Sequence, residues 1–167
     1  MLSTGATFKE IADTVITGDV RLPAVVTLPE EQDAPIVVMV HGSGATDRDE
    51  TVYENKPFRD IATKLADCGI ATLRYDKRTF IYRQKVSSMD DETILDALSA
   101  IRLARKYGKR IFILGHSLGA MLAPIIASRA EEKPEGIIMM AAPARNLEEV
   151  VREQFDYLLP SGTSDSY

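Results

Sequence analysis

Short, wholly apolar runs alternate along this 167-residue chain with segments of helical, amphipathic periodicity. Three of these runs, Pro35–Val40, Ile111–Leu114 and Ile137–Ala141, contain no polar side chain, which is typical of strands buried on both faces of a sheet. Parallel strands joined by crossover helices are the economical way to fold such an alternation. We therefore predict an α/β protein with a mostly parallel sheet that is covered by helices on both faces.

Local signals place the remaining elements around these three strands. We predict two further strand elements, an edge hairpin that contains Ala24–Leu28 and ends at Pro29, and a strand Ile70–Arg74. We also predict three helices. The first has Asn55 as N-cap and ends at Gly69, the second begins with a capping box of Ser88 and Asp91 and ends at Gly108, and the third ends near Arg129. The alternation of strand and helix holds for most of the length, and the sequence contains no internal repeat.

The last part of the chain differs in character from the rest. Residues 1–145 form the predicted α/β unit, whereas residues 146–167 comprise an amphipathic, helix-prone segment over Asn146–Leu159 and then a polar tail. Since no further strand follows, Ile137–Ala141 would be left as an apolar edge strand. Such an edge favours pairing with a second copy of the chain.

Charge and leader signals exclude several function classes. Twenty Lys and Arg are interspersed with twenty-five Asp and Glu, for a formal net charge of −5, so we expect neither a nucleic-acid partner nor an anionic membrane. The start, Met1–Ala6, lacks the features of a signal peptide, and no apolar run has the length of a membrane span, so we expect a cytoplasmic protein.

The lone Cys68 is expected to be a small buried residue at the end of a helix.

One motif indicates chemistry. Gly115–Gly119 has the Gly-x-Ser-x-Gly pattern and lies between a predicted buried strand and a predicted helix, which is the context of a serine nucleophile in a strained turn. Glycines on both sides of Ser117 would allow neighbouring elements to approach that turn closely. A tight turn without a catalytic role is the alternative. No histidine follows Ser117, so the usual base of such a nucleophile is missing from these residues.

A second glycine-rich segment supplies possible oxyanion donors. His41–Gly44 follows the predicted central strand, where a loop can direct a backbone N–H at a developing negative charge. We assign the two donors of this oxyanion hole to the backbone N–H groups of Ser43 and Leu118. A Gly-x-Gly turn alone is weak evidence, since such turns also merely reverse the chain.

The motifs also carry a family resemblance when they are taken in order. They are His41–Gly44, Asp47–Glu50, Asn55–Phe58, Arg74–Arg78 and Gly115–Gly119, within a span of about Leu22–Pro143. With this series the chain resembles the N-terminal portion of a bacterial α/β-hydrolase of the carboxylesterase, dienelactone-hydrolase-like and serine-aminopeptidase-like group.

This resemblance implies a fold and an activity. It implies an incomplete α/β-hydrolase sheet of about six of eight strands, with Ser117 as nucleophile, the Ser43 and Leu118 N–H groups as oxyanion hole, and Asn146–Leu159 as the start of a lid. The triad acid and histidine of the family follow later strands that these residues do not include. We therefore expect a hydrolase of small carboxylic esters that acts through an acyl-enzyme and is inactive as this chain alone. The alternative is a non-catalytic, hydrolase-like association module that forms homo-oligomers through its uncovered edge.

The remaining polar and sulfur-containing residues have structural interpretations that we prefer. His41 is expected to order its loop by hydrogen bonds, although a base role near Ser117 stays open, and His116 is expected to pack locally. Asp47–Glu50 could hold a metal or a charged substrate, but salt links to Arg74–Arg78 are the preferred interpretation. Met139 and Met140 are expected in the core. No phosphate-binding loop or metal-ligand cluster is present in the sequence, so we expect no cofactor and no metal.

Overall fold

A six-stranded sheet forms the centre of the molecule. The computed structural model describes residues 8–83, 88, 93–145, 149 and 152–153. The strands are β1 (Phe8–Thr17), β2 (Val20–Pro29), β3 (Ile36–Val40), β4 (Ala71–Tyr75), β5 (Ile111–His116) and β6 (Gly136–Met140), in the spatial order β1-β2-β4-β3-β5-β6. Pairs β4/β3, β3/β5 and β5/β6 are parallel, and the hairpin β1/β2 joins β4 antiparallel. The mostly parallel sheet and the edge hairpin predicted from the sequence are confirmed.

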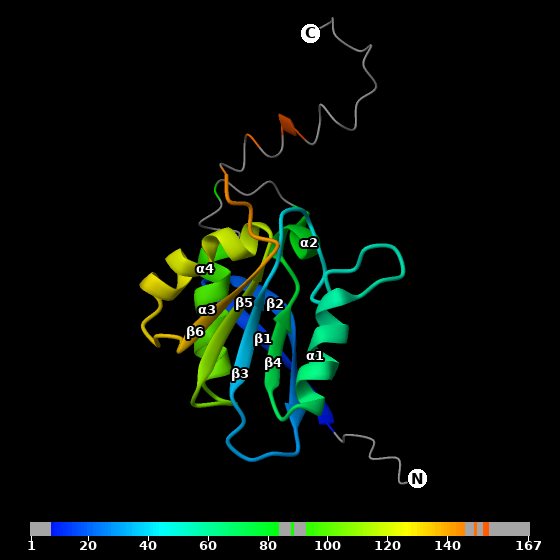
Figure 1. The fold of residues 1–167 in the computed structure, drawn as a ribbon, viewed down its shortest axis with the longest axis vertical. Helices are drawn as coiled ribbons and strands as arrows, with labels where there is room; N and C mark the ends of the chain where they lie inside the picture. Colours follow the sequence, from blue (N-terminus) through cyan, green and yellow to red (C-terminus); the bar gives the residue numbers. More distant parts are fainter. Residues whose placement is uncertain (1–7, 84–87, 89–92, 146–148, 150–151, 154–167) are drawn as a thin grey trace, which may run out of the picture.

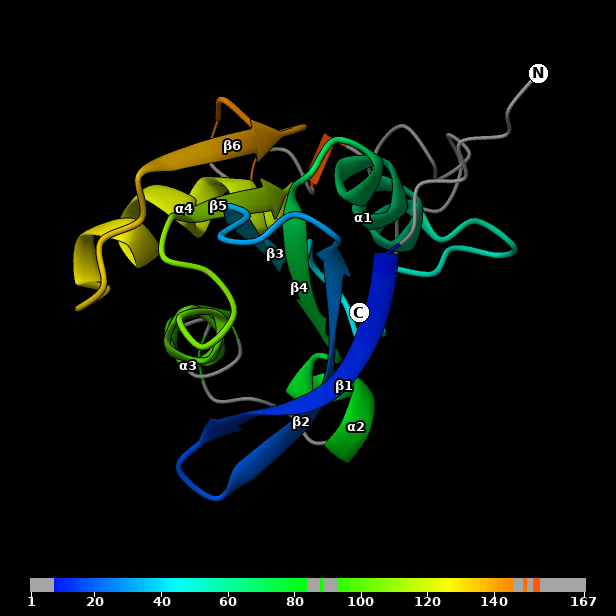
Figure 2. The same cartoon turned by 90° about the horizontal axis from the view of Figure 1, so that it is seen from below.

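Helices cover both faces of this sheet (Figures 1 and 2). They are α1 (Pro57–Asp67), α2 (Arg78–Tyr82), α3 (Leu95–Ala104) and α4 (Leu118–Arg129). The central strand β3 explains the arrangement, because all five of its side chains are buried and successive ones point to opposite faces. Ile36, Val38 and Val40 pack in one core with residues of α3 and α4, whereas Val37 and Met39 pack in a second core with α1.

The first helix begins one residue later than the sequence suggested. Its N-cap is Lys56, and the backbone of Asn55 is instead paired with Val52 in a short antiparallel bridge. Pro57 occupies the start of α1, where its missing N–H costs nothing, and Gly69 follows the end of the helix with φ +76°. Asp91 of the predicted capping box, and most of the predicted helix Asn146–Leu159, lie outside the described residues.

Two sequence predictions about burial are wrong. Cys68 is exposed, because it caps the C-terminus of α1 one residue beyond the last turn that packs on the sheet. Met139 is 47% exposed and only Met140 packs partly against a core, because within the described residues nothing pairs with the outer edge of β6. Ile137 and Ile138 of the same strand are also exposed, so the predicted apolar edge is present.

None of the described helices has both the length and the apolar character needed to cross a lipid bilayer.

Candidate active site

The turn between β5 and α4 holds Ser117 in an unusual backbone conformation. Its φ is +51° and its ψ −113°, a region that residues with a side chain rarely occupy, and its side chain is half-buried. Helix α4 begins at the next residue, so the free N–H groups of its first turn lie beside the serine. The strained strand–turn–helix geometry predicted for Ser117 is confirmed.

The two flanking glycines are required by packing. A Cβ at Gly115 would lie 2.3 Å from the carbonyl oxygen of Gly119, and a Cβ at Gly119 would lie 2.3 Å from the carbonyl oxygen of Val40. Both distances are far shorter than any real carbon–oxygen contact. Only glycine therefore permits β5, α4 and the end of β3 to meet this closely at Ser117.

The loop after β3 lies directly against the serine. A Cβ built on Gly42 would be 3.4 Å from the Cβ of Ser117. The backbone of Gly42 therefore lies directly against the side chain of Ser117. Gly42 is buried, the next residue Ser43 is exposed, and Leu118 follows Ser117 directly as the first residue of α4. Parallel strands β3 and β5 bring the three predicted site residues, Ser43, Ser117 and Leu118, to one end of the sheet.

Glu50 links this loop to the turn, a role that the sequence did not reveal. Its buried carboxylate accepts a hydrogen bond of 2.7 Å from the N–H of Gly42 and lies 2.9 Å from Nδ1 of His116. The side chain of His116 is therefore held by a contact with a residue 66 positions away, and not by the local packing that the sequence led us to expect. The only sequence signal for Glu50 was its place at the end of the acidic run Asp47–Glu50.

The contacts of His41 support the loop-ordering interpretation. It is buried, with its Nε2 3.1 Å from the carbonyl oxygen of Asp47 and its ring packed against Phe58 and Tyr75. Burial, with a smaller contribution from the charge of Lys77, lowers the pKa of His41 to about 3. The imidazole is therefore neutral at pH 7, and its Nε2–H donates to the Asp47 carbonyl.

The acidic loop forms salt links with the basic run at the end of β4, as predicted. Arg74 is buried and bonds Asp49 and, at 2.6 Å, Glu10, while Arg48 bonds Asp76 at 3.1 Å. The backbone N–H of Arg48 also donates to Asp76, at 2.7 Å. These carboxylates are therefore engaged by cations, and within the described ranges no group of three His, Cys, Asp or Glu is placed to hold a metal ion.

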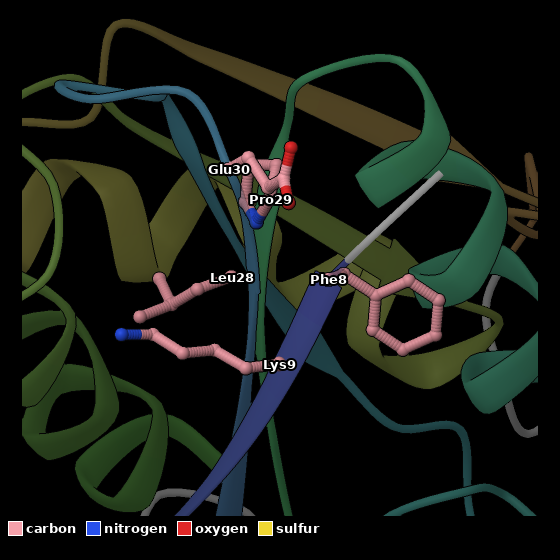
Figure 3. Close-up of a pocket in the computed structure, with 5 residues that line it drawn as sticks. All are labelled: Phe8, Lys9, Leu28, Pro29 and Glu30. Carbon is pink, nitrogen blue, oxygen red and sulfur yellow. The ribbon is translucent and has the colours of Figure 1, made fainter. Parts of the chain in front are cut away.

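A hollow lies elsewhere on the molecule, at the edge hairpin. It has a volume of about 300 Å³ and is lined by residues at the start of β1 and the end of β2, namely Phe8, Lys9, Leu28, Pro29 and Glu30 (Figure 3). Strands β4 and β3 lie between this hairpin and the strand that carries the serine. Because of this separation, the hollow is not part of the site around Ser117.

Comparison with known proteins assigns this arrangement to a family. The sequence profile of the family described as "Serine aminopeptidase, S33" matches residues 31–159, which include the Gly42 loop and the Ser117 turn. The chain belongs to this family of α/β-hydrolases. Esterase EstD of Thermotoga maritima is 46% identical to this S33-family chain over 150 residues. The match covers 87% of the chain but 36% of EstD, so the chain spans about a third of that esterase.

Solved structures show the same fold. The Pyrococcus furiosus esterase Pf2001 superposes on 92% of this S33-family chain with a TM-score of 0.70 at 22% identity, and the chain covers 57% of it. The bacterial brefeldin A esterase, a homologue of human hormone-sensitive lipase, gives a TM-score of 0.64 at 19% identity, with 92% of this chain and 46% of that one covered. The chain therefore has an α/β-hydrolase fold and spans about half of these neighbours.

Proposed function

We propose that this chain supplies the nucleophile and the oxyanion hole of a serine esterase that hydrolyses small carboxylic esters. The observation that carries the proposal is the strained turn at Ser117, which glycine contacts hold against the Gly42 loop. The 46% identity to an esterase across this region supports the choice of ester substrates. No cofactor or metal is part of the proposed reaction.

The proposed reaction proceeds through an acyl-enzyme. The hydroxyl oxygen of Ser117 attacks the ester carbonyl, the resulting oxyanion accepts hydrogen bonds from the N–H groups of Ser43 and Leu118, and the alcohol leaves with the serine proton. Water then attacks the acyl group and releases the acid and free Ser117. The backbone donors are fixed before the reaction, so they stabilise the transition state without reorganising.

We infer that the base for this reaction comes from residues other than those that the structure describes. The two histidines of the sequence are His41, whose Nε2 bonds the Asp47 carbonyl, and His116, whose Nδ1 bonds Glu50, and in the described structure neither ring is hydrogen-bonded to the Ser117 hydroxyl. In the part of the chain that the structure describes, no titratable side chain accepts the hydroxyl proton of Ser117. Loss of a triad member removes on the order of 10⁴ to 10⁶ in rate, so we expect the chain alone to be nearly inert.

Two assays test this proposal. The purified chain is first measured with p-nitrophenyl acetate, and turnover near the buffer background, equal in the wild type and Ser117→Ala, is expected. Turnover at the level of an intact esterase that Ser117→Ala abolishes would show that the site is complete and would refute the missing base.

The second assay restores the missing groups. In a chimera, this chain replaces the matching part of EstD, so that the rest of EstD supplies whatever the chain lacks. We expect esterase activity that Ser117→Ala removes and that the exposed-site control Ser128→Ala leaves unchanged. Activity that survives Ser117→Ala would refute Ser117 as the nucleophile.

A non-catalytic association module is the second candidate function. It is favoured by the outer strand β6, on which Ile137, Ile138 and Met139 are 38%, 43% and 47% exposed. An unpaired apolar strand is a template for pairing with another copy of the chain. We expect light scattering at micromolar concentration to detect a homo-oligomer that Met139→Lys converts to monomer, and a monomeric wild type would refute this candidate.

The cytoplasmic location expected from the sequence is part of the proposal. Its support is the single, exposed thiol of Cys68, which is compatible with a reducing compartment. Quantification of Cys68 in its free and oxidised forms in freshly lysed cells would test it, with the free thiol as the expected result.

A further inference from the structure

The ammonium group of Lys77 is buried beneath the loop that carries the proposed oxyanion donor. Lys77 follows β4 and is 2% exposed, and its Nζ donates a hydrogen bond of 2.9 Å to the carbonyl oxygen of Gly42. A lysine is rarely buried to this extent, because the loss of hydration is costly unless a specific interaction compensates. The contact partner is therefore a guide to what Lys77 does.

Planar geometry connects this contact to Ser43. The carbonyl of Gly42 and the N–H of Ser43 belong to the same peptide group, which is trans, so the two point in opposite directions. When Lys77 holds the carbonyl on the buried side of the loop, the N–H of Ser43 must point to the other side. Ser43 is exposed there, and no backbone acceptor for its N–H is found among the described residues.

The peptide that carries the N–H of Gly42 is held by a negative charge, opposite in sign to that of Lys77. The carboxylate of Glu50 accepts the N–H of Gly42 at 2.7 Å, so an anion holds the N–H and a cation holds the carbonyl of the same glycine. Since Glu50 is also 2.9 Å from Nδ1 of His116, the Gly42 loop is held in register with the residue that precedes Ser117. Both charged groups are buried, so solvent screens these hydrogen bonds little.

We propose that Lys77 is a positioning residue, which locks the Gly42–Ser43 peptide in the orientation that presents the Ser43 N–H to the oxyanion. Without the cation, this glycine-rich peptide can rotate and present its carbonyl instead, which would repel negative charge. The cation also polarises the peptide and makes the Ser43 N–H a stronger donor. The catalytic consequence rests on the proposed esterase function. The hydrogen bond from Lys77 that fixes the Gly42 carbonyl, called the lock below, is a property of this chain.

The lock is tested on the full chain by nuclear magnetic resonance. In Lys77→Met, the Gly42 carbonyl carbon loses a hydrogen bond from a cation, so its resonance should move upfield and that of the Ser43 amide should shift with it. Lys109→Met serves as the matched control, because Lys109 is 85% exposed and pairs weakly with Asp33 at 3.7 Å. A Gly42 resonance that Lys77→Met leaves unchanged would refute the lock.

A measurement on the unaltered chain covers the case in which Lys77→Met does not fold. A buried, hydrogen-bonded ammonium group exchanges its protons with water slowly, so the Nζ protons of Lys77 should be observable in a spectrum of the ¹⁵N-lysine-labelled chain at pH 6. Rapid exchange, equal to that of Lys109, would contradict the burial and hydrogen bond on which the lock depends.

The catalytic consequence is tested in the EstD chimera. Removing an oxyanion donor costs about 10² to 10³ in kcat; since Lys77→Met misplaces the donor without deleting it, we expect a loss of about 10- to 100-fold in kcat with little change in KM. Lys77→Gln, which retains a donor, should recover part of the loss, and Lys109→Met should match the parent. An unchanged kcat in Lys77→Met refutes the catalytic role. An inactive parent chimera counts against the esterase proposal, while the carbonyl shift still decides the lock.

Discussion

The backbone N–H of Ser117 donates a hydrogen bond of 2.9 Å to the carbonyl oxygen of Met140. This bond attaches the strained turn to the end of β6, the outer strand of the described sheet. The same strand exposes apolar side chains on its surface, so a structural support of Ser117 lies at an exposed edge of the described sheet. A partner that pairs with β6 would therefore also stabilise the position of Ser117.

Replacing Ser117 by glycine should stabilise the protein. The positive φ of +51° costs a side-chain-bearing residue about 1–3 kcal/mol, whereas glycine adopts it freely, and its greater freedom in the unfolded chain offsets only part of that gain. We expect the free energy of unfolding to rise by about 1 kcal/mol in Ser117→Gly, measured in urea, and to stay near the wild-type value in Ser117→Ala. Ser128→Gly in the exposed face of α4 is the matched control and should destabilise. A loss of stability in Ser117→Gly would show that the turn is not strained.

Alanine at Gly119 should destabilise the protein strongly. Gly119 lies in the first turn of α4, where alanine is intrinsically favoured, but its Cβ would lie 2.3 Å from the backbone oxygen of Val40, which cannot move without displacing β3. Overpacking against the backbone costs about 3 kcal/mol, more than the helical gain, so urea unfolding should show a net loss of that order. Gly18→Ala in the β1/β2 turn meets no atom within 4 Å at φ +57°, and should cost only the conformational strain, about 1 kcal/mol. Equal losses at the two positions would contradict the close contact with Val40.

Features that depend on local sequence could be predicted before the structure was known. The continuous apolar run over Ile36–Val40 indicates a strand covered on both faces, and the glycines around Ser117 indicate a close approach of neighbouring elements. In each case the physical cause is a property of the residues themselves, namely the absence of polar atoms or of a Cβ.

Features that depend on distant contacts could not be predicted. Lys77 and Gly42 are 35 residues apart, and Glu50 and His116 are 66 apart, so nothing in the local pattern connects them. The exposure of Met139 has a similar origin, because its apolar side chain indicates burial and only the position of β6 at the edge of the described sheet leaves it open.

Neutralising Asp49 should destabilise the fold much more than neutralising an exposed carboxylate. Arg74 is 2% exposed and bonds Asp49, which is itself 14% exposed, so Asp49→Asn leaves a buried guanidinium whose one remaining anionic partner among the described residues is Glu10. Removing one partner of a buried ion pair costs about 3 kcal/mol, and we expect a loss of that order in urea unfolding at pH 7. Asp33→Asn is the control, because Asp33 and Lys109 are largely exposed and 3.7 Å apart, and should cause no measurable change. Similar losses in both variants would refute the buried pair.

The stability of the protein should fall as the pH drops below about 6.5, and His41 should be one cause. Burial lowers the pKa of His41 to about 3 in the folded chain, whereas the unfolded chain has the ordinary value of 6.5. Between these two values the unfolded chain binds a proton that the folded chain does not, so the stability that His41 contributes is fully present above pH 6.5 and is lost toward pH 3. This amounts to about 2 kcal/mol between pH 7 and pH 5. Between pH 7 and pH 5, the free energy of unfolding measured in urea should fall by about 2 kcal/mol less in His41→Gln than in the wild type.

The Cε1 proton resonance of His41 should also stay constant from pH 8 to pH 5, and a titration midpoint near 6.5 would show that the ring is accessible to protons.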